Sequence, residues 1–329
     1  MANTEDTQLL SADRPGSYLN GDSIQSHSGS KSKMSEGWFT HVDKFLDNLR
    51  LRNELVRQFF AELLGTFMLV LIGDGAIAQM QFFGGTALGA GFLNVNIGYA
   101  FGLMLGVYFT ASVSGGHLNP AVSLAFCTLG KLRWIAFPVY MLAQFIGAFL
   151  AAVMVFAVYY DAIDKHDHNR TVVGGTAGIF ATYPKAELSW GVGFVDQLLG
   201  TALLMAGIMA VTDNKNSKPP NGLEPIFVAL TFFAVGISFG YNFGYGINPA
   251  RDFGPRVFTA IAGYGSDVWT LNGIQWWIIP TFVPFLGAPV GAWVYYLAIG
   301  MHCESPHRGQ GDHAELLEAQ APDAAEKSM

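Results

Sequence analysis

Two asparagines stand out as residues whose type and spacing could act on a passing solute. Asn119 lies in Ser-Gly-Gly-His-Leu-Asn-Pro-Ala-Val, and Asn248 lies 129 residues later (248 − 119) in Gly-Tyr-Gly-Ile-Asn-Pro-Ala-Arg-Asp-Phe-Gly-Pro-Arg. Asparagine is a good helix N-cap, and proline suits the first helical position because its missing N–H is not needed there. Each tripeptide therefore predicts the start of a short helix, over about 119–129 and 248–260. Their first turns contain Pro120, Ala121, Pro249 and Ala250.

Both predicted helices are too short to cross a bilayer. A helix over 119–129 is roughly 16 Å long at ~1.5 Å per residue, about half of a ~30 Å hydrocarbon core. Broken helices at membrane depth are tolerated where they line a wet cavity, and two at matching places indicate a transport site at the midplane. Their two positive N-termini would repel cations and hydronium but admit neutral molecules. The NH₂ groups of the two asparagines are expected to face the lumen.

Four further polar side chains are placed at or near this depth. Arg251 lies three residues into the second short helix, where a charged side chain is functional by default, and it would repel cations and donate to hydroxyls. Glu62 and its counterpart Gln197 are expected to accept hydrogen bonds from the backbone that leads into the short helices. We take Glu62 as the only acid of the early spans, with a proton relay as the alternative role. His117 is interpreted as a pore-lining or structural histidine rather than a ligand.

The composition indicates a polytopic membrane protein. The chain has 329 residues, of which 51% are hydrophobic and 13% charged, and its mean hydropathy is +0.32. Typical soluble domains carry about 25% charged residues. Six spans are predicted, over about 55–78, 91–111, 134–160, 190–212, 225–243 and 274–300. We interpret 1–50 as a disordered cytoplasmic tail, 51–302 as the transmembrane channel and 303–329 as a second cytoplasmic tail.

An inverted repeat follows from the span count and from a recurring tetrapeptide. Lysine and arginine precede the first span and are missing from the loop after it, which places the N-terminus in the cytoplasm. Six spans then put both termini inside and invert the second half, about 190–300, relative to the first, about 55–160. Leu63-Leu64-Gly65-Thr66 recurs as Leu198-Leu199-Gly200-Thr201 at an offset of 135 (198 − 63), close to the asparagine spacing. Asn169 begins a glycosylation sequon in the predicted outer loop 161–187.

These motifs resemble those of the major intrinsic proteins, the aquaporin family, over about residues 55–300. Within that family the chain resembles the aquaglyceroporins, which place an aspartate directly after the arginine of the second motif, here Asp252, and a basic residue four positions further on, here Arg256. Pro280 and Thr281 in the last span also fit this group. The resemblance implies an all-α fold of six transmembrane helices and two re-entrant half-helices, assembled as a homotetramer with one pore per subunit.

The resemblance also implies where the pore is narrowest. Matching the family's filter to this sequence places it at Tyr99, Gly236, Tyr245 and Arg251. Water-selective members commonly carry histidine at the position of Gly236, so the glycine is expected to open that wall. The two tyrosines would then present an apolar face opposite the arginine donors, which suits a polyol. Tyrosine at position 99 is a departure, because phenylalanine or tryptophan is more usual there.

We therefore expect a passive channel in the lipid bilayer that conducts water and glycerol or similar small uncharged polyols. Its sequon favours the plasma membrane. The channel would exclude protons and ions and would need no cofactor, metal or nucleic acid. The main alternative is a water-selective aquaporin with little solute flux, against which Gly236 and Asp252 argue. A secondary active transporter would need coupling acids at mid-depth, where only Glu62 is assigned. A membrane enzyme would need a nucleophile set or metal cluster at that depth, and the sequence suggests neither.

Overall fold

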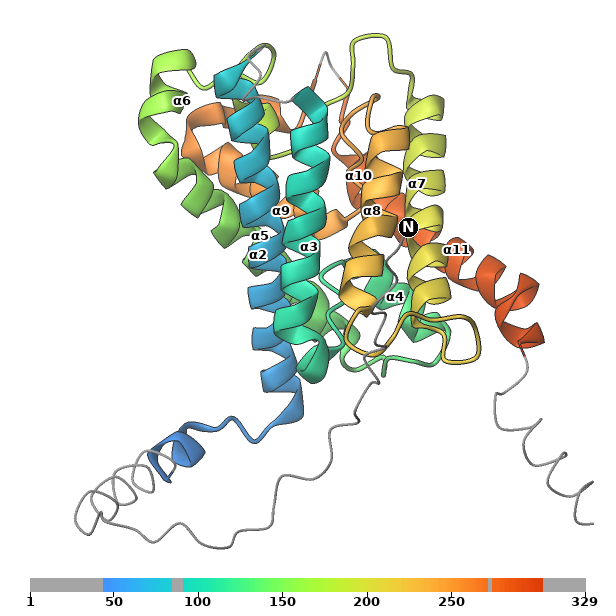
Figure 1. Cartoon of the computed structure of the whole chain (residues 1–329). Coiled ribbons are helices and arrows are strands. Elements are labelled where there is room, and N and C mark those ends of the chain that lie inside the picture. The colour runs from blue at the N-terminus through green and yellow to red at the C-terminus, as the bar shows by residue number, and fades with distance from the viewer. Residues whose placement is uncertain (1–43, 85–90, 272–273, 304–329) are drawn as a thin grey trace, which may run out of the picture. The chain divides into compact units, whose positions relative to one another are not determined.

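The computed structural model of this chain describes residues 44–84, 91–271 and 274–303 (Figure 1). Within these ranges the secondary structure is helical, apart from an isolated antiparallel bridge between Leu271 and Ile274. Residues 44–49 form a short helix in a compact unit that ends at Arg50, and the remainder of the chain forms the second unit. Most of the two predicted tails, 1–50 and 303–329, lies outside the described residues.

Five helical segments are long and apolar enough to cross a membrane, and a sixth is shorter. The five are α2 (Glu54–Phe83), α3 (Gly91–Ser114), α5 (Phe137–Val158), α7 (Trp190–Thr212) and the segment Ile278–His302. The last comprises α10 (Ile278–Phe282), α11 (Pro284–Ala298) and the 3₁₀ turn η4 (Gly300–His302). The shorter apolar helix is α8 (Glu224–Phe239), with 16 residues. Short helical turns connect these segments: α6 (Tyr160–His166), η1 (Ala177–Ile179), η2 (Ala260–Tyr264) and η3 (Gly265–Val268).

Several helix ends differ from the sequence prediction, among them the end of the second span at Ser114 rather than 111 and the start of the last span at Ile278 rather than 274. The first span continues to Phe83 because polar side chains in its last turns find partners: Gln79 donates to the Tyr159 hydroxyl at 2.7 Å, and Gln81 donates to the Gly175 carbonyl at 3.0 Å. The fifth span ends at Phe239 rather than 243, and the chain turns before Gly244, which has a φ of 81°. A positive φ of this kind favours glycine, which has no Cβ to clash.

The two short helices are α4 (Pro120–Thr128) and α9 (Pro249–Thr259), each too short to span a bilayer. Each packs mainly against the opposite half of the chain, since α9 contacts α5 and α4 contacts α11. The long helices repeat the same pairing in both halves: α2 packs on α3 and α5, and α7 packs on α8 and α11. This exchange interlocks the halves and matches the expected inverted repeat of six membrane helices and two half-helices.

The recurring Leu-Leu-Gly-Thr tetrapeptide has a packing reason. A Cβ at Gly65 would meet the side chain of Leu118, and a Cβ at Gly200 would lie 3.1 Å from Ile247. Leu118 and Ile247 are the residues immediately before the two capping asparagines. Each repeated glycine therefore provides the close approach that lets a half-helix begin against the long helix of its own half.

Candidate functional site

The two half-helices begin at capping asparagines that bond to each other's loops. The Asn119 side chain accepts from the Ala121 N–H at 2.9 Å, and Asn248 accepts from the Ala250 N–H at 3.0 Å. The Nδ2 group of Asn119 donates to the Ile247 carbonyl at 3.0 Å, and that of Asn248 donates to the Leu118 carbonyl at 2.8 Å. The caps were expected from sequence, whereas the reciprocal bonds between the halves were not.

These bonds correct the expectation that both asparagine NH₂ groups face the lumen freely. Each amide has two N–H donors, and one of the two is used to bind the opposite loop. Both asparagines nonetheless line a cavity of about 360 Å³, here called the asparagine cavity. The second N–H of each amide is the one that remains to meet a passing oxygen.

Glu62 and Gln197 support the two loops, as the sequence suggested. Glu62 is fully buried and accepts from the His117 N–H at 3.0 Å and the Leu118 N–H at 2.8 Å. Gln197 accepts from the Ile247 N–H at 2.7 Å through Oε1. Its Nε2 donates to Asp196 at 3.1 Å, a neighbour that the sequence reasoning did not single out. Each half thus fixes the backbone before its asparagine with one buried acceptor side chain.

His117 has both features that were proposed for it. It lines the asparagine cavity, and its Nδ1 lies 3.1 Å from the Ser123 hydroxyl. Its ring packs between Phe126 and Tyr140, with centroid distances of 4.7 and 5.1 Å. The imidazole is therefore held in place at the cavity wall by one polar and two aromatic contacts.

The four predicted filter residues come from four different segments and lie together. Tyr99 is on α3, Gly236 on α8, Tyr245 on the loop before Asn248, and Arg251 on α9. The Arg251 guanidinium carbon lies 4.7 Å from the centre of the Tyr99 ring, and its Nη1 donates to the Phe180 carbonyl at 3.0 Å. This cation–π contact and the carbonyl bond fix the guanidinium orientation.

The space beside Gly236 is occupied, which corrects the expectation that this glycine opens the wall. A Cβ at this position would lie 2.8 Å from Cζ of Tyr245 and would also meet the Asn96 side chain. Tyr245 adopts a φ of 39°, in the left-handed region that is uncommon for residues other than glycine. The missing side chain therefore makes room for the Tyr245 ring.

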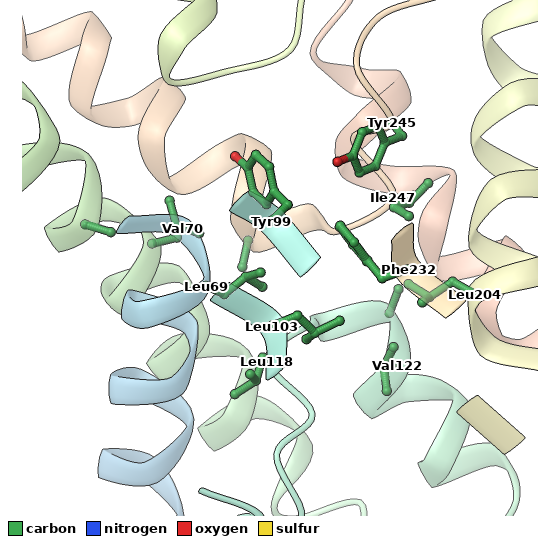
Figure 2. Packing of buried hydrophobic residues seen from close by; sticks show 14 of the residues in the cluster. Leu69, Val70, Tyr99, Leu103, Leu118, Val122, Leu204, Phe232, Tyr245 and Ile247 are labelled. Atoms are coloured by element: carbon green, nitrogen blue, oxygen red, sulfur yellow. The ribbon is translucent and has the colours of Figure 1, made fainter. Parts of the chain in front are cut away.

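Phe232 joins the two tyrosines and was missed in the sequence reasoning. Its ring centre lies 5.3 Å from that of Tyr245 and 6.2 Å from that of Tyr99, and the two tyrosine rings are 6.2 Å apart (Figure 2). Phe232 stands four residues before Gly236 on α8, one helical turn away on the same face. This spacing is the signal that would have found it.

Two cavities lie next to the group formed by Tyr99, Phe232 and Tyr245. Phe232 lines the asparagine cavity, whereas Gly236 and Arg251 line a second cavity of about 590 Å³, here called the arginine cavity. Tyr99 and Tyr245 are both buried and line neither cavity. Each ring lies next to Phe232, and each also lies next to a residue that lines the second cavity, Arg251 for Tyr99 and Gly236 for Tyr245. We therefore infer that the tyrosine rings form the constriction between the two cavities.

Asp252 is placed away from both cavities and braces the loop beside the filter. Its Oδ1 accepts from Arg256 at 3.0 and 2.8 Å, and its Oδ2 accepts from the backbone N–H of Thr182 at 2.8 Å and from the Thr182 hydroxyl. Arg256 also donates to the carbonyls of Thr182 at 2.6 Å and Val268 at 2.7 Å. All of these groups are buried, so the pair holds the segment after Phe180 against α9.

A second acid lies in the first span, which corrects the assignment of Glu62 as the only one. Asp74 is fully buried in α2. Its Oδ1 accepts from the Tyr99 hydroxyl and lies 3.8 Å from Nη1 of Arg251. Asp74 stands in a strongly apolar stretch of the sequence, and its contact with the filter depends on tertiary packing.

The connection between α5 and α7 contains the sequon and a well-anchored aspartate. Asn169 is exposed in a turn after α6. Asp167 accepts from the backbone N–H groups of Thr171 at 2.9 Å and Thr176 at 2.8 Å. Burial raises the pKa of Asp167, but these donors and the two threonine hydroxyls outweigh it and hold the pKa below its ordinary value. The carboxylate thus closes the loop 167–176.

Helices that interlock as an inverted repeat, with two capped half-helices that meet at the wall of the asparagine cavity, define a membrane channel. A family model described as Major intrinsic protein matches residues 50–295. The chain belongs to the major intrinsic protein family.

The chain is similar to several aquaporins. It is 43% identical to Aquaporin-10 of Milnesium tardigradum over 297 residues, covering 83% of this chain and 72% of the relative. It is 41% identical to Aquaporin-10 of Homo sapiens over 281 residues, covering 84% and 91%. The solved structure of the aquaglyceroporin from Plasmodium falciparum matches with a TM-score of 0.67 and 29% identity, covering 75% of this chain and 98% of that one. The predicted fold and the predicted resemblance to aquaglyceroporins are confirmed.

Proposed function

We propose that this chain conducts water and glycerol, or similar small uncharged polyols, passively across a membrane and excludes protons and ions. The observation that carries the proposal is the contact between the Arg251 guanidinium and the Tyr99 ring, 4.7 Å apart, at the inferred constriction. A polyol has hydroxyls along one side and CH groups along the other. The guanidinium offers five fixed N–H donors, and the aromatic rings offer an apolar surface to the carbon chain.

The two half-helices supply the barrier to ions. Each helix N-terminus carries a partial positive charge of roughly 0.5 elementary charge, and the two reciprocal asparagine bonds hold both N-termini at the same depth. Arg251 adds a full charge nearby. A cation or hydronium that enters this region meets unfavourable electrostatic potential, whereas a neutral solute does not. No covalent chemistry is part of this function.

The assembly and placement are also proposals. We infer a homotetramer with one pore per subunit in the plasma membrane, with the tails 1–50 and 303–329 in the cytoplasm and Asn169 glycosylated outside. Support for the membrane setting comes from large apolar side chains on the outer helix surfaces, such as Phe109 at 66% and Val158 at 71% exposure. Support for Asn169 as a modification site comes from its exposed turn.

The test is uptake of labelled glycerol and osmotic swelling in cells that express the chain. We expect both to exceed those of uninjected or empty-vector controls and to lack sodium or proton dependence. Arg251→Val should preserve water swelling and weaken the exclusion of protons. Swelling without glycerol uptake would favour a water-selective pore. This is the specific alternative because the rings of Tyr99, Phe232 and Tyr245 pack closely together.

A further inference from the structure

Asp74 is the buried acid for which the channel architecture gives no account. It lies in the apolar helix α2 with no exposed surface. Oδ1 accepts from the Tyr99 hydroxyl and lies 3.8 Å from Arg251 Nη1. Oδ2 has no hydrogen-bond partner among the residues that the structure describes. Burying a carboxylate is unfavourable unless it is paired, so its retention here calls for a reason.

Two other buried acids near the pore, Glu62 and Asp252, have an architectural role and look different. Glu62 accepts from Ser114 at 2.6 Å through Oε1 and from Gln144 at 2.7 Å through Oε2, besides the two backbone donors already described. Asp252 has partners on both oxygens as well. Within the described residues, Asp74 has polar partners at Oδ1 alone, and these two partners, the Tyr99 hydroxyl and the Arg251 guanidinium, belong to the filter.

The residue before Asp74 contacts the same ring. A Cβ at Gly73 would overlap the Cδ1, Cε1 and Cζ atoms of Tyr99. The ring therefore lies directly against the α2 backbone, in a notch that exists because residue 73 has no side chain. The notch places the tyrosine hydroxyl within reach of the next residue, so Gly73 and Asp74 together hold both the face and the tip of the ring.

We propose that Gly73 and Asp74 form a dock that holds the Tyr99 ring to one side of the constriction and thereby sets which polyols pass. Asp74 is a positioning residue that acts through Tyr99 and through the charge it presents to Arg251. A ring released from the dock can move toward Tyr245, whose centroid is 6.2 Å away, and narrow the passage. Water would still pass there, whereas a three-carbon chain would be hindered. This inference deepens the proposed function and rests on it.

The first test compares variants that remove either end of the Asp74–Tyr99 bond. Asp74→Val keeps the size of the side chain but accepts no hydrogen bond, and Tyr99→Phe removes only the hydroxyl. We expect each to lower the glycerol-to-water permeability ratio by roughly threefold or more, within the range that loss of one buried hydrogen bond allows. The double variant should show no further fall, because both changes break the same bond. Asp74→Asn retains an acceptor oxygen and should keep most of the wild-type ratio.

The second test uses a matched pair of glycines on the same helix. Gly73→Ala should push the ring out of its notch and lower the ratio, whereas Gly75→Ala is the control, because a Cβ there meets nothing within 4 Å. If Asp74→Val does not fold, Gly73→Ala and Tyr99→Phe still test the dock. A wild-type protein without glycerol flux would contradict the proposed function itself. Normal wild-type glycerol flux with unchanged ratios in Asp74→Val, Tyr99→Phe and Gly73→Ala would overturn the dock.

Discussion

Gly236→Ala is the substitution that most sharply probes how the Tyr245 ring is placed. A Cβ at residue 236 would overlap Oδ1 of Asn96, the end of a side chain that can turn aside, and would lie 2.8 Å from Cζ of Tyr245, whereas an ordinary carbon–carbon contact is about 3.5–4.0 Å. The ring must therefore retreat by about 1 Å. Gly236 stands on α8, so the ring is pushed away from that helix. Overpacking of this kind is typically unfavourable by about 1–3 kcal/mol.

If this strain must be overcome each time a glycerol molecule passes, it adds to the barrier for permeation. A rise of about 1–3 kcal/mol lowers the glycerol rate roughly 5- to 150-fold. Water needs a narrower opening and should lose much less. The assay is stopped-flow light scattering on proteoliposomes with water and glycerol gradients, and the readout is the ratio of the two permeabilities.

The controls separate crowding at the filter from a general effect of the substitution. Gly191→Ala is the matched glycine change, because a Cβ at residue 191 in α7 meets nothing within 4 Å. Tyr245→Cys in the Gly236→Ala background removes the crowded ring and should recover much of the glycerol flux. Equal losses of water and glycerol in Gly236→Ala, or no loss of either, would refute the placement of Tyr245 at the constriction.

Three further predictions concern the supports of the pore. Asn248→Asp keeps the cap but replaces the donor to Leu118 with an acceptor, and it should lower the free energy of unfolding by about 1–3 kcal/mol, measured as a lower midpoint of thermal unfolding in detergent. Glu62→Leu leaves buried backbone N–H groups unpaired and should reduce the yield of folded protein in size-exclusion chromatography, whereas Glu62→Gln, which mimics Gln197, should retain most of it. Asp167 has a lowered pKa, so its stabilisation of loop 167–176 is full above the ordinary carboxyl pKa of 3.8 and is lost as pH falls through the lower folded-state value. Protease resistance of the loop should therefore persist at pH 5 to 7, and Asp167→Asn should be cleaved faster throughout that range.

Outcomes against these three predictions would be equally specific. An unchanged unfolding midpoint in Asn248→Asp would mean that the reciprocal amide bonds contribute little. Equal yields of Glu62→Leu and Glu62→Gln would mean that Glu62 does not satisfy the loop backbone. Loop cleavage that accelerates already between pH 7 and 5 would point to a group other than Asp167.

Much of the fold could be predicted because its signals are local. An asparagine followed by proline specifies a helix start through its own cap, and the structure places both caps where the sequence does. Long apolar runs specify the membrane helices in the same way. Helix ends were less predictable because they depend on distant partners. The last turns of α2 are stabilised by Tyr159 and Gly175, which lie 80 and 94 residues away in the chain.

The four filter residues proposed from the sequence lie together, but their contacts could not be predicted, and Phe232 and Asp74 were missed. Gly236 was expected to leave space, yet that space is filled by a ring from a loop that only the folded chain brings near. Asp74 is 25 residues from Tyr99, and no spacing rule links a residue on one helix to a hydroxyl on the next. Composition alone gives no role to one acid among apolar residues. The role proposed for Asp74 comes from its contacts with Tyr99 and Arg251.

The most direct test of the central claim is stopped-flow light scattering on proteoliposomes containing the full chain. A sucrose gradient is applied first and a glycerol gradient second to the same preparation. We expect fast shrinkage with sucrose, and with glycerol fast shrinkage followed by fast reswelling as glycerol enters. Fast shrinkage with no faster reswelling than in protein-free liposomes would contradict a polyol pore. It would mean that the rings of Tyr99 and Tyr245 admit water alone.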